Sequence, residues 1–259
     1  MNHTKIKRTQ LIHHHLQQRL DKITSSEYLK ILLLRTVGNF LVLSSLFMAA
    51  KTFYQPAREE IKYLVNRITN KQYVVAVPAR QGKDDMKFRL DDSKKGKGFL
   101  AQNFKINQVE VINPEDPNFS IVIPKIGANA RILANVNAAN ETEYLEALQQ
   151  GVAHTGGTAF PGEGGHIFLF AHSTDYFWNV GTYNAVFYLL YKLEKEDEVD
   201  LFYKGQRYVY KIIGKEIVDP SRVEYLTRKT NKEFLTLQTC WPPGTTLKRL
   251  LLFATRVSE

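Results

Sequence analysis

The stretch that decides the fold is Phe234-Leu-Thr-Leu-Gln-Thr-Cys-Trp-Pro-Pro-Gly-Thr-Thr-Leu-Lys-Arg-Leu-Leu-Leu-Phe-Ala-Thr255. Two runs rich in apolar and β-branched residues flank a Trp-Pro-Pro-Gly-Thr segment, which predicts strands at Phe234–Cys240 and Leu250–Thr255 joined by a short loop. Cys240 ends the first run, and Arg249 precedes the second. If the two strands pair antiparallel, Cys240 and Arg249 lie at the same end of a sheet.

From residue 104 onward, other short runs have the same texture of strand-forming residues between turn residues. They are Gln108–Ile112, Phe119–Ile123, Arg131–Val136, His166–Ala171, Glu198–Tyr203 and Tyr208–Val218. Thr142–Gln150 predicts a short helix, and Val152–Gly157, with His154, is expected to be a loop. Roughly eight closely spaced strands with little helix predict a mainly β domain, either an antiparallel barrel or a sandwich.

The net charge of +9 is unevenly distributed along the chain. The basic excess lies wholly in residues 1–103, while residues 104–259 are slightly acidic. A basic flank beside an apolar segment orients a membrane protein, so we expect no nucleic acid among the partners.

The apolar segment is Ile31–Ala50, in which Arg35 is the one charged residue. About twenty residues are needed to cross a bilayer. We therefore predict a single transmembrane helix at 31–52 in contact with membrane lipid, a cytoplasmic basic tail at 1–30, and everything that follows outside the cell. A buried helix of a soluble protein and a cleaved signal peptide are the alternatives, and both fit the length and flanks less well.

Residues 53–103 are expected to form a stalk or linker before a catalytic domain at 104–259. Glu59–Ile68 has a weak helical pattern, and Tyr73–Val77 predicts a short strand. Gln81–Gly98 is rich in Lys, Asp and Gly, which is typical of a solvated loop.

Cys240 is the single cysteine, so it forms no disulfide within the chain. It is either a small buried residue or a reactive thiol, and only the thiolate is a nucleophile. Of the histidines after residue 104, His172 follows a predicted strand and opens a polar loop, where a side chain is both held and accessible. A fixed guanidinium at Arg249 could stabilise an oxyanion. Its pKa is too high for Arg249 to act as an acid or base.

Four segments in order resemble the sortase family. Thr236–Cys240 with Arg249 resembles the family signature, and the strand ending in His172-Ser173 resembles its histidine segment. Ile121–Ala130 is similar to the family's early strand, as are Gly151–His154 and Gly157–Gly162 to the stretch before the histidine. The resemblance covers about residues 104–259.

The resemblance implies an eight-stranded β-barrel enzyme with Cys240 as nucleophile, His172 as proton carrier and Arg249 as oxyanion and substrate stabiliser. Such enzymes cleave a Leu-Pro-x-Thr-Gly-type sorting signal on surface proteins, form a thioacyl intermediate and transfer it to an amine. A peptidoglycan precursor or a pilin lysine is the expected acceptor. Thr239, Trp241 and His154 are the candidate substrate-binding residues.

The short Trp241–Gly244 loop resembles the class D and E sortases, and Asp116–Phe119 is expected to be a turn. No cofactor or metal is expected, although Glu141, Glu143 and Glu146 lie where some sortases bind calcium. Two other functions remain open: a non-catalytic extracellular β-barrel module for binding or structure, and a cysteine hydrolase that uses water.

Overall fold

The computed structural model describes residues 24–69, 71–76, 109–173 and 186–257. The chain divides into two units, Met1–Tyr54 and Gln55–Glu259. Most of the predicted tail 1–30 and the predicted loop Gln81–Gly98 lie outside the described residues.

Helix α2, Ser25–Ile68, begins before the predicted span and continues into the predicted stalk. Thr24 and Glu27 cap its start reciprocally: the Glu27 carboxylate accepts from the Thr24 backbone N–H at 3.0 Å, and the Thr24 hydroxyl accepts from the Glu27 backbone N–H at 3.4 Å. The stretch Ser25–Tyr54 is long and apolar enough to cross a membrane, and its apolar window has no buried residue. Within the described chain these residues are exposed, which favours the predicted membrane span over a buried core helix.

Eight strands of the second unit close into a barrel in the order β10-β8-β7-β3-β4-β5-β6-β9, and β9 pairs again with β10. The pairs β4–β5 and β6–β9 are parallel, and the others are antiparallel. The strands are β3 Phe119–Ile123, β4 Ala128–Val136, β5 Val152–Thr155, β6 His166–Phe170, β7 Glu198–Tyr203, β8 Gln206–Val218, β9 Phe234–Trp241 and β10 Lys248–Arg256. The eight-stranded barrel is thus confirmed, and the sandwich is excluded.

One loop prediction was wrong, and one predicted strand is confirmed but lies outside the barrel. Val152–Thr155, expected to be a loop, is barrel strand β5, and all four of its residues are buried. Strand β5 has only four residues and is followed closely by Gly156-Gly157, a turn signal, so the local sequence favoured a loop. Gln108–Ile112 does form a strand, β2 Val109–Ile112, but β2 lies outside the barrel and pairs in parallel with β1, Gln72–Val75.

Strand β1 ties part of the predicted stalk to the folded domain. Val75 is buried and packs with Val122 and Phe202 from the barrel. The part of the predicted stalk that forms β1 therefore packs with the folded domain.

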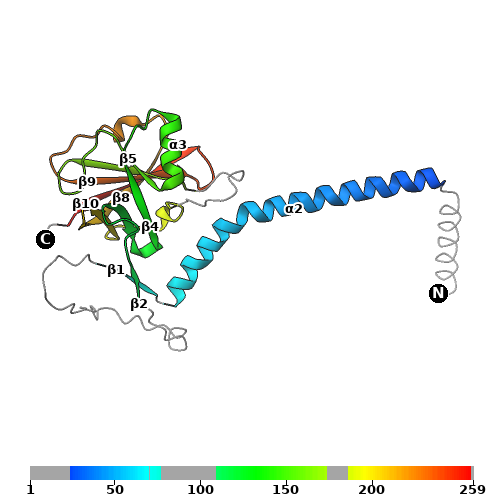
Figure 1. Ribbon diagram of the computed structural model, residues 1–259, viewed down its shortest axis with the longest axis horizontal. Coiled ribbons are helices and arrows are strands. Elements are labelled where there is room, and N and C mark those ends of the chain that lie inside the picture. The colour runs from blue at the N-terminus through cyan, green and yellow to red at the C-terminus, as the bar shows by residue number, and fades with distance from the viewer. Residues whose placement is uncertain (1–23, 70, 77–108, 174–185, 258–259) are drawn as a thin grey trace, which may run out of the picture. The chain divides into compact units, whose positions relative to one another are not determined.

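Helix α3, Glu141–Gln150, packs on β4 and β5 (Figure 1). The Asn140 side chain caps its first turn by accepting from the Glu143 backbone N–H at 3.3 Å. Ala147 and Leu148 are buried against the barrel core. Short 3-10 helices lie at Pro124–Ile126 (η1), Leu190–Lys192 (η2) and Val223–Tyr225 (η3).

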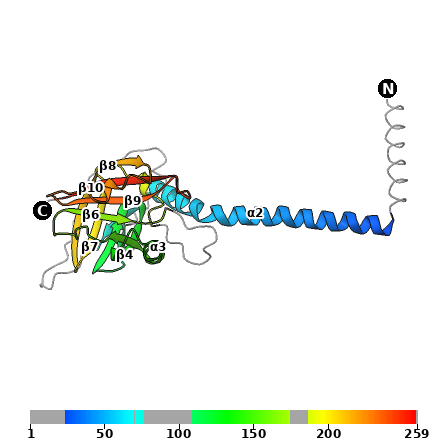
Figure 2. The ribbon, with the colours of Figure 1, turned by 90° about the horizontal axis from the view of Figure 1, so that it is seen from above.

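The two faces of β9 and β10 carry different clusters. Leu235, Leu237, Leu250 and Leu252 point into the barrel core. On the outer face, Leu251 packs with Phe168 and Val218 in a separate buried cluster, with Tyr225 and Leu226 of the β8–β9 connection against it. Figure 2 shows β10 running beside β8 and β9 on this side of the barrel.

Candidate active site

Cys240 and Arg249 are direct partners in the antiparallel β9–β10 pair. The expectation that they lie at the same end of a sheet is therefore confirmed. Residues opposite each other in such a pair have Cβ atoms about 4.5–5.5 Å apart and project from the same face. The thiol and the guanidinium thus start from neighbouring backbone positions.

His172 lies two residues after the end of β6, the strand that pairs with β9 on the side opposite β10. Strands β6 and β9 are parallel, and their last register pair is Phe170 with Gln238. The Ala171 N–H then donates to the Gln238 carbonyl at 3.1 Å, and the buried Thr239 hydroxyl donates to the Ala171 carbonyl at 2.9 Å. Extended by two residues beyond its last pair, this register would place His172 next to Cys240.

By this extended register the three residues form one row, with Cys240 on β9, Arg249 on β10 and His172 just after β6. Because side chains alternate along a strand, Cys240 shares the outer face with Thr236 and not the inner face of Leu235 and Leu237. Arg249 likewise shares the outer face of Leu251. The row therefore lies on the outer face of the barrel and not in its core.

Burial raises the pKa of the Cys240 thiol, and the positive charge of Arg249 acts in the opposite direction. Cys240 is half-buried, so burial has the larger effect. The resting thiol is therefore mostly protonated at neutral pH, and its activation requires a proton acceptor. His172 is the adjacent group of that kind, and it is half-buried, with its backbone carbonyl accepting from the Phe187 N–H at 3.3 Å.

The Arg249 guanidinium is anchored to the loop between β9 and β10. Its Nη1 donates to the carbonyls of Thr246 and Lys248, both at 3.2 Å. A guanidinium has five N–H donors, so contacts through one nitrogen leave donors for a substrate carbonyl. The arrangement can therefore present a fixed positive charge beside the thiol.

The three predicted substrate-binding residues have different environments. His154 is fully buried on β5, where Nδ1 accepts from the Asn135 N–H at 3.2 Å and Nε2 contacts the Thr158 hydroxyl at 2.9 Å. In this structure His154 packs inside the domain and exposes no surface, and substrate binding by His154 stays a prediction.

Thr239 is also buried, and its hydroxyl is used in the bond to Ala171. The bond holds β9 to the segment after β6, and substrate binding by Thr239 stays a prediction. Trp241 is half-buried and packs with Tyr191 of η2, with ring centroids 5.4 Å apart. Tyr191 was not singled out from the sequence, because nothing in its local pattern indicates a contact with the end of β9.

Within the part of the chain that the structure describes, no group of three or more His, Cys, Asp or Glu side chains is placed to hold a metal ion. Glu143 of the predicted acidic set accepts from the Asn137 backbone N–H at 2.9 Å, which stabilises the start of α3. Calcium binding by this set stays a prediction.

A half-buried thiol thus lies on a closed eight-stranded barrel, with an arginine as its register partner and a histidine just after the neighbouring strand. The family model of the sortase domain matches residues 121–257. The chain therefore belongs to the sortase family. A position among the short-loop classes D and E is compatible with the matches.

Sortase D from Bacillus subtilis (strain 168) is 30% identical over 139 residues, which are 52% of this chain and 62% of that protein. The match thus spans less than two thirds of this relative. Sortase C-1 from Actinomyces oris is 30% identical, with a TM-score of 0.46 over 56% of this chain and 76% of that one. The Clostridium perfringens sortase D5 transpeptidase is 24% identical, with a TM-score of 0.44 over 57% and 82%.

Proposed function

We propose that the protein is a membrane-anchored cysteine transpeptidase that transfers a sorting-signal acyl group to an amine. The observation that carries the proposal is the register pair of Cys240 and Arg249, with His172 two residues beyond the end of β6, the strand on the other side of β9. Membership of the sortase family supports the same chemistry.

The reaction begins when the His172 imidazole accepts the Cys240 thiol proton and Sγ attacks the carbonyl carbon of the scissile peptide bond. Arg249 stabilises the resulting oxyanion. The C–N bond then breaks, the imidazolium gives its proton to the departing amine, and a thioester remains on Cys240.

In the second half, an incoming amine attacks the thioester carbonyl and gives a proton to His172. The tetrahedral intermediate collapses to a new amide, and Cys240 leaves and recovers its proton. The same residues would serve a hydrolase if water took the place of the amine. The half-buried position of Cys240 supports the transpeptidase, because limited water access favours an amine.

The substrates proposed are surface proteins with a Leu-Pro-x-Thr-Gly-like signal, with a peptidoglycan precursor or a pilin lysine as acceptor. The apolar stretch Ser25–Tyr54 would anchor the enzyme, with the basic tail in the cytoplasm and the barrel outside.

The test uses the full chain in detergent micelles with a Leu-Pro-x-Thr-Gly peptide and a soluble amine. We expect a ligated product by mass spectrometry, and a covalent adduct on Cys240 when the amine is omitted. Cys240→Ala is expected to abolish both products. Cleavage that survives in Cys240→Ala would refute the proposal, and release of free acid only, with excess amine, would favour the hydrolase. If the protein is soluble and folded but cleaves no peptide of a peptide library, the non-catalytic module is favoured.

A further inference from the structure

Tyr191 lies between the end of β9 and helix α2. Its ring packs on Trp241, with centroids 5.4 Å apart and planes at 55°. Its hydroxyl donates a short hydrogen bond to the carboxylate of Glu60, in the part of α2 that belongs to the barrel unit. One side chain therefore contacts both the residue after Cys240 and this helix.

Lys192 strengthens the same contact. Its ammonium pairs with Glu60 at 3.2 Å and lies 4.7 Å from the centre of the Tyr191 ring. The backbone beside it is fixed to β8, because Lys215 Nζ donates to the carbonyls of Tyr191 and Leu193 at 2.9 and 3.0 Å. Because Lys215 holds the Tyr191 backbone in place, we expect a substitution at Glu60 to move the Tyr191 side chain and not its backbone.

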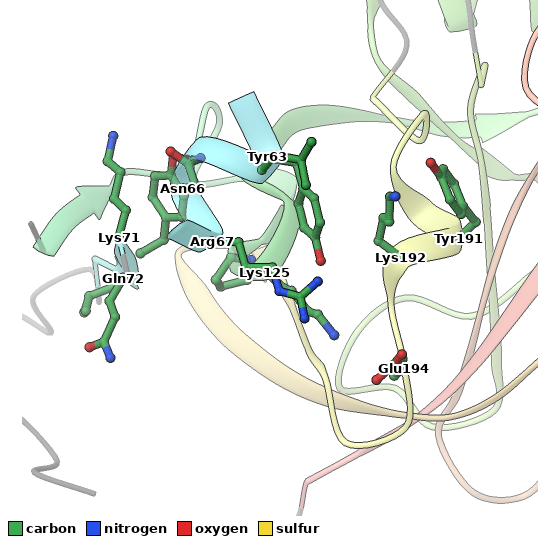
Figure 3. A pocket seen from close by; sticks show the side chains of 13 residues that line it. Tyr63, Asn66, Arg67, Lys71, Gln72, Lys125, Tyr191, Lys192 and Glu194 are labelled. Carbon is green, nitrogen blue, oxygen red and sulfur yellow. Dashed lines mark hydrogen bonds between the residues drawn. The ribbon is translucent and has the colours of Figure 1, made fainter. Parts of the chain in front are cut away.

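The contact is polar and borders a cavity of about 700 Å³. Figure 3 shows Tyr63 of α2 facing Lys192 and Tyr191 of η2 across this cavity. Burial, followed by the hydrogen bond to Glu60, raises the pKa of the Tyr191 hydroxyl, so it remains a donor at neutral pH. Helix and barrel thus meet here through a few removable polar contacts and not through a filled apolar interface.

Trp241 follows Cys240 directly and packs against the barrel core. Fixing its ring fixes the backbone at which β9 ends, and with it the alignment of Cys240 with Arg249. We propose that Tyr191 is a positioning residue that couples the Glu60 segment of α2 to Trp241 and so holds Cys240 in its reactive place. The consequence for turnover rests on the proposed function, whereas the coupling itself does not.

The test uses the full chain in detergent micelles with Trp178→Phe, so that Trp241 is the remaining tryptophan of two. Glu60→Ala, Tyr191→Phe and Tyr191→Leu are compared with Glu59→Ala, a matched control at the adjacent carboxylate. Three quantities are measured: Trp241 emission, the pH profile of Cys240 alkylation, and kcat and KM for acyl transfer.

We expect Glu60→Ala and Tyr191→Phe to shift Trp241 emission to longer wavelength and to lower kcat roughly three- to tenfold, with KM within about twofold. Tyr191→Leu, which also loses the ring contact, has the larger effect. Because both remove one contact, the Glu60→Ala/Tyr191→Phe double variant is no worse than either single variant. The Cys240 alkylation profile shifts in the same variants, and Glu59→Ala matches the parent.

Unchanged emission and alkylation in Glu60→Ala, with changes in Tyr191→Leu alone, would overturn the coupling and leave Tyr191 a packing residue. Equal effects of Glu59→Ala and Glu60→Ala would also overturn the coupling, because they would show that any lost carboxylate on this part of α2 has the same effect. If the parent transfers no acyl group but emission and alkylation still respond to Glu60→Ala, the proposed function fails and the coupling stands.

Discussion

Arg249 is the register partner of Cys240 at the end of the β9–β10 pair, and its Nη1 is tied to the carbonyls of Thr246 and Lys248. The guanidinium therefore cannot swing freely away from the thiol. A charge that is already in place when an oxyanion forms needs no reorganisation, which is the condition for strong transition-state stabilisation.

Replacing Arg249 should reduce acylation far more than it reduces stability. We expect Arg249→Ala to lower kcat/KM for the peptide by about 10²–10³-fold. Arg249→Lys keeps the charge but loses the planar set of donors, so it should recover only part of the loss. Lys248→Met is the control, because Lys248 pairs with Asp219 at 2.6 Å and lies outside the row. Wild-type kcat/KM in Arg249→Ala would contradict the assigned role.

The alkylation of Cys240 should depend on pH in a way that separates the folded from the unfolded protein. Because burial raises the pKa of the folded thiol, less thiolate is present at neutral pH than in the denatured chain. Iodoacetamide should therefore react more slowly with the folded protein at pH 7.5, with a midpoint above ~8.5, the usual thiol pKa. The chain has one cysteine, so adduct mass reports on Cys240 alone. A midpoint below that of the denatured chain would show that Arg249 outweighs burial.

The Thr239 hydroxyl should matter for both stability and catalysis. Thr239→Val leaves the buried Ala171 carbonyl without this donor and should cost about 1–3 kcal/mol in the free energy of unfolding. Because that bond joins β9 to β6 just before His172, acylation should also slow. Thr239→Ser keeps the donor and should lie closer to wild type in denaturant unfolding and in single-turnover acylation. Equal unfolding free energies and acylation rates in Thr239→Val and Thr239→Ser would show that the hydroxyl contributes to neither.

His166 should make the protein less stable as the pH falls. Burial, followed by the charge of Arg228, lowers the pKa of His166 to about 4 from its usual value of 6.5. The unfolded chain therefore binds a proton first, so this residue's contribution is full above about pH 6.5 and is lost as pH falls towards 4.

The loss amounts to about 3 kcal/mol below the folded pKa. His166→Gln, which can still bond to the Thr236 hydroxyl, should flatten the dependence of unfolding free energy on pH between 4 and 6.5. Asp200, whose pKa burial raises to about 6, contributes with the opposite sign in both proteins and cancels in the comparison. The same slope in wild type and variant would contradict the assignment to His166.

Local sequence was enough to predict the elements that have one exposed and one buried face, or that have clear turn residues at their ends. Phe119–Ile123 and Glu198–Tyr203 have the predicted bounds, and α3 differs from its prediction by one residue. The juxtaposition of Cys240 and Arg249 also followed from sequence, because a short loop between two strands forces them together. The exposed apolar stretch Ser25–Tyr54 contains the predicted span.

Tertiary structure alone decided which strands are neighbours and which side chains are covered. Strand β5 has only four residues and is followed closely by a turn signal, so the burial of His154 was not evident from local pattern. The contact of Glu60 with Tyr191 joins residues far apart in the chain, and neither has a local signature. Alternation and turns are properties of adjacent residues and can be read in order. Burial and long-range contacts depend on how separate segments pack, and that is settled only when the barrel closes.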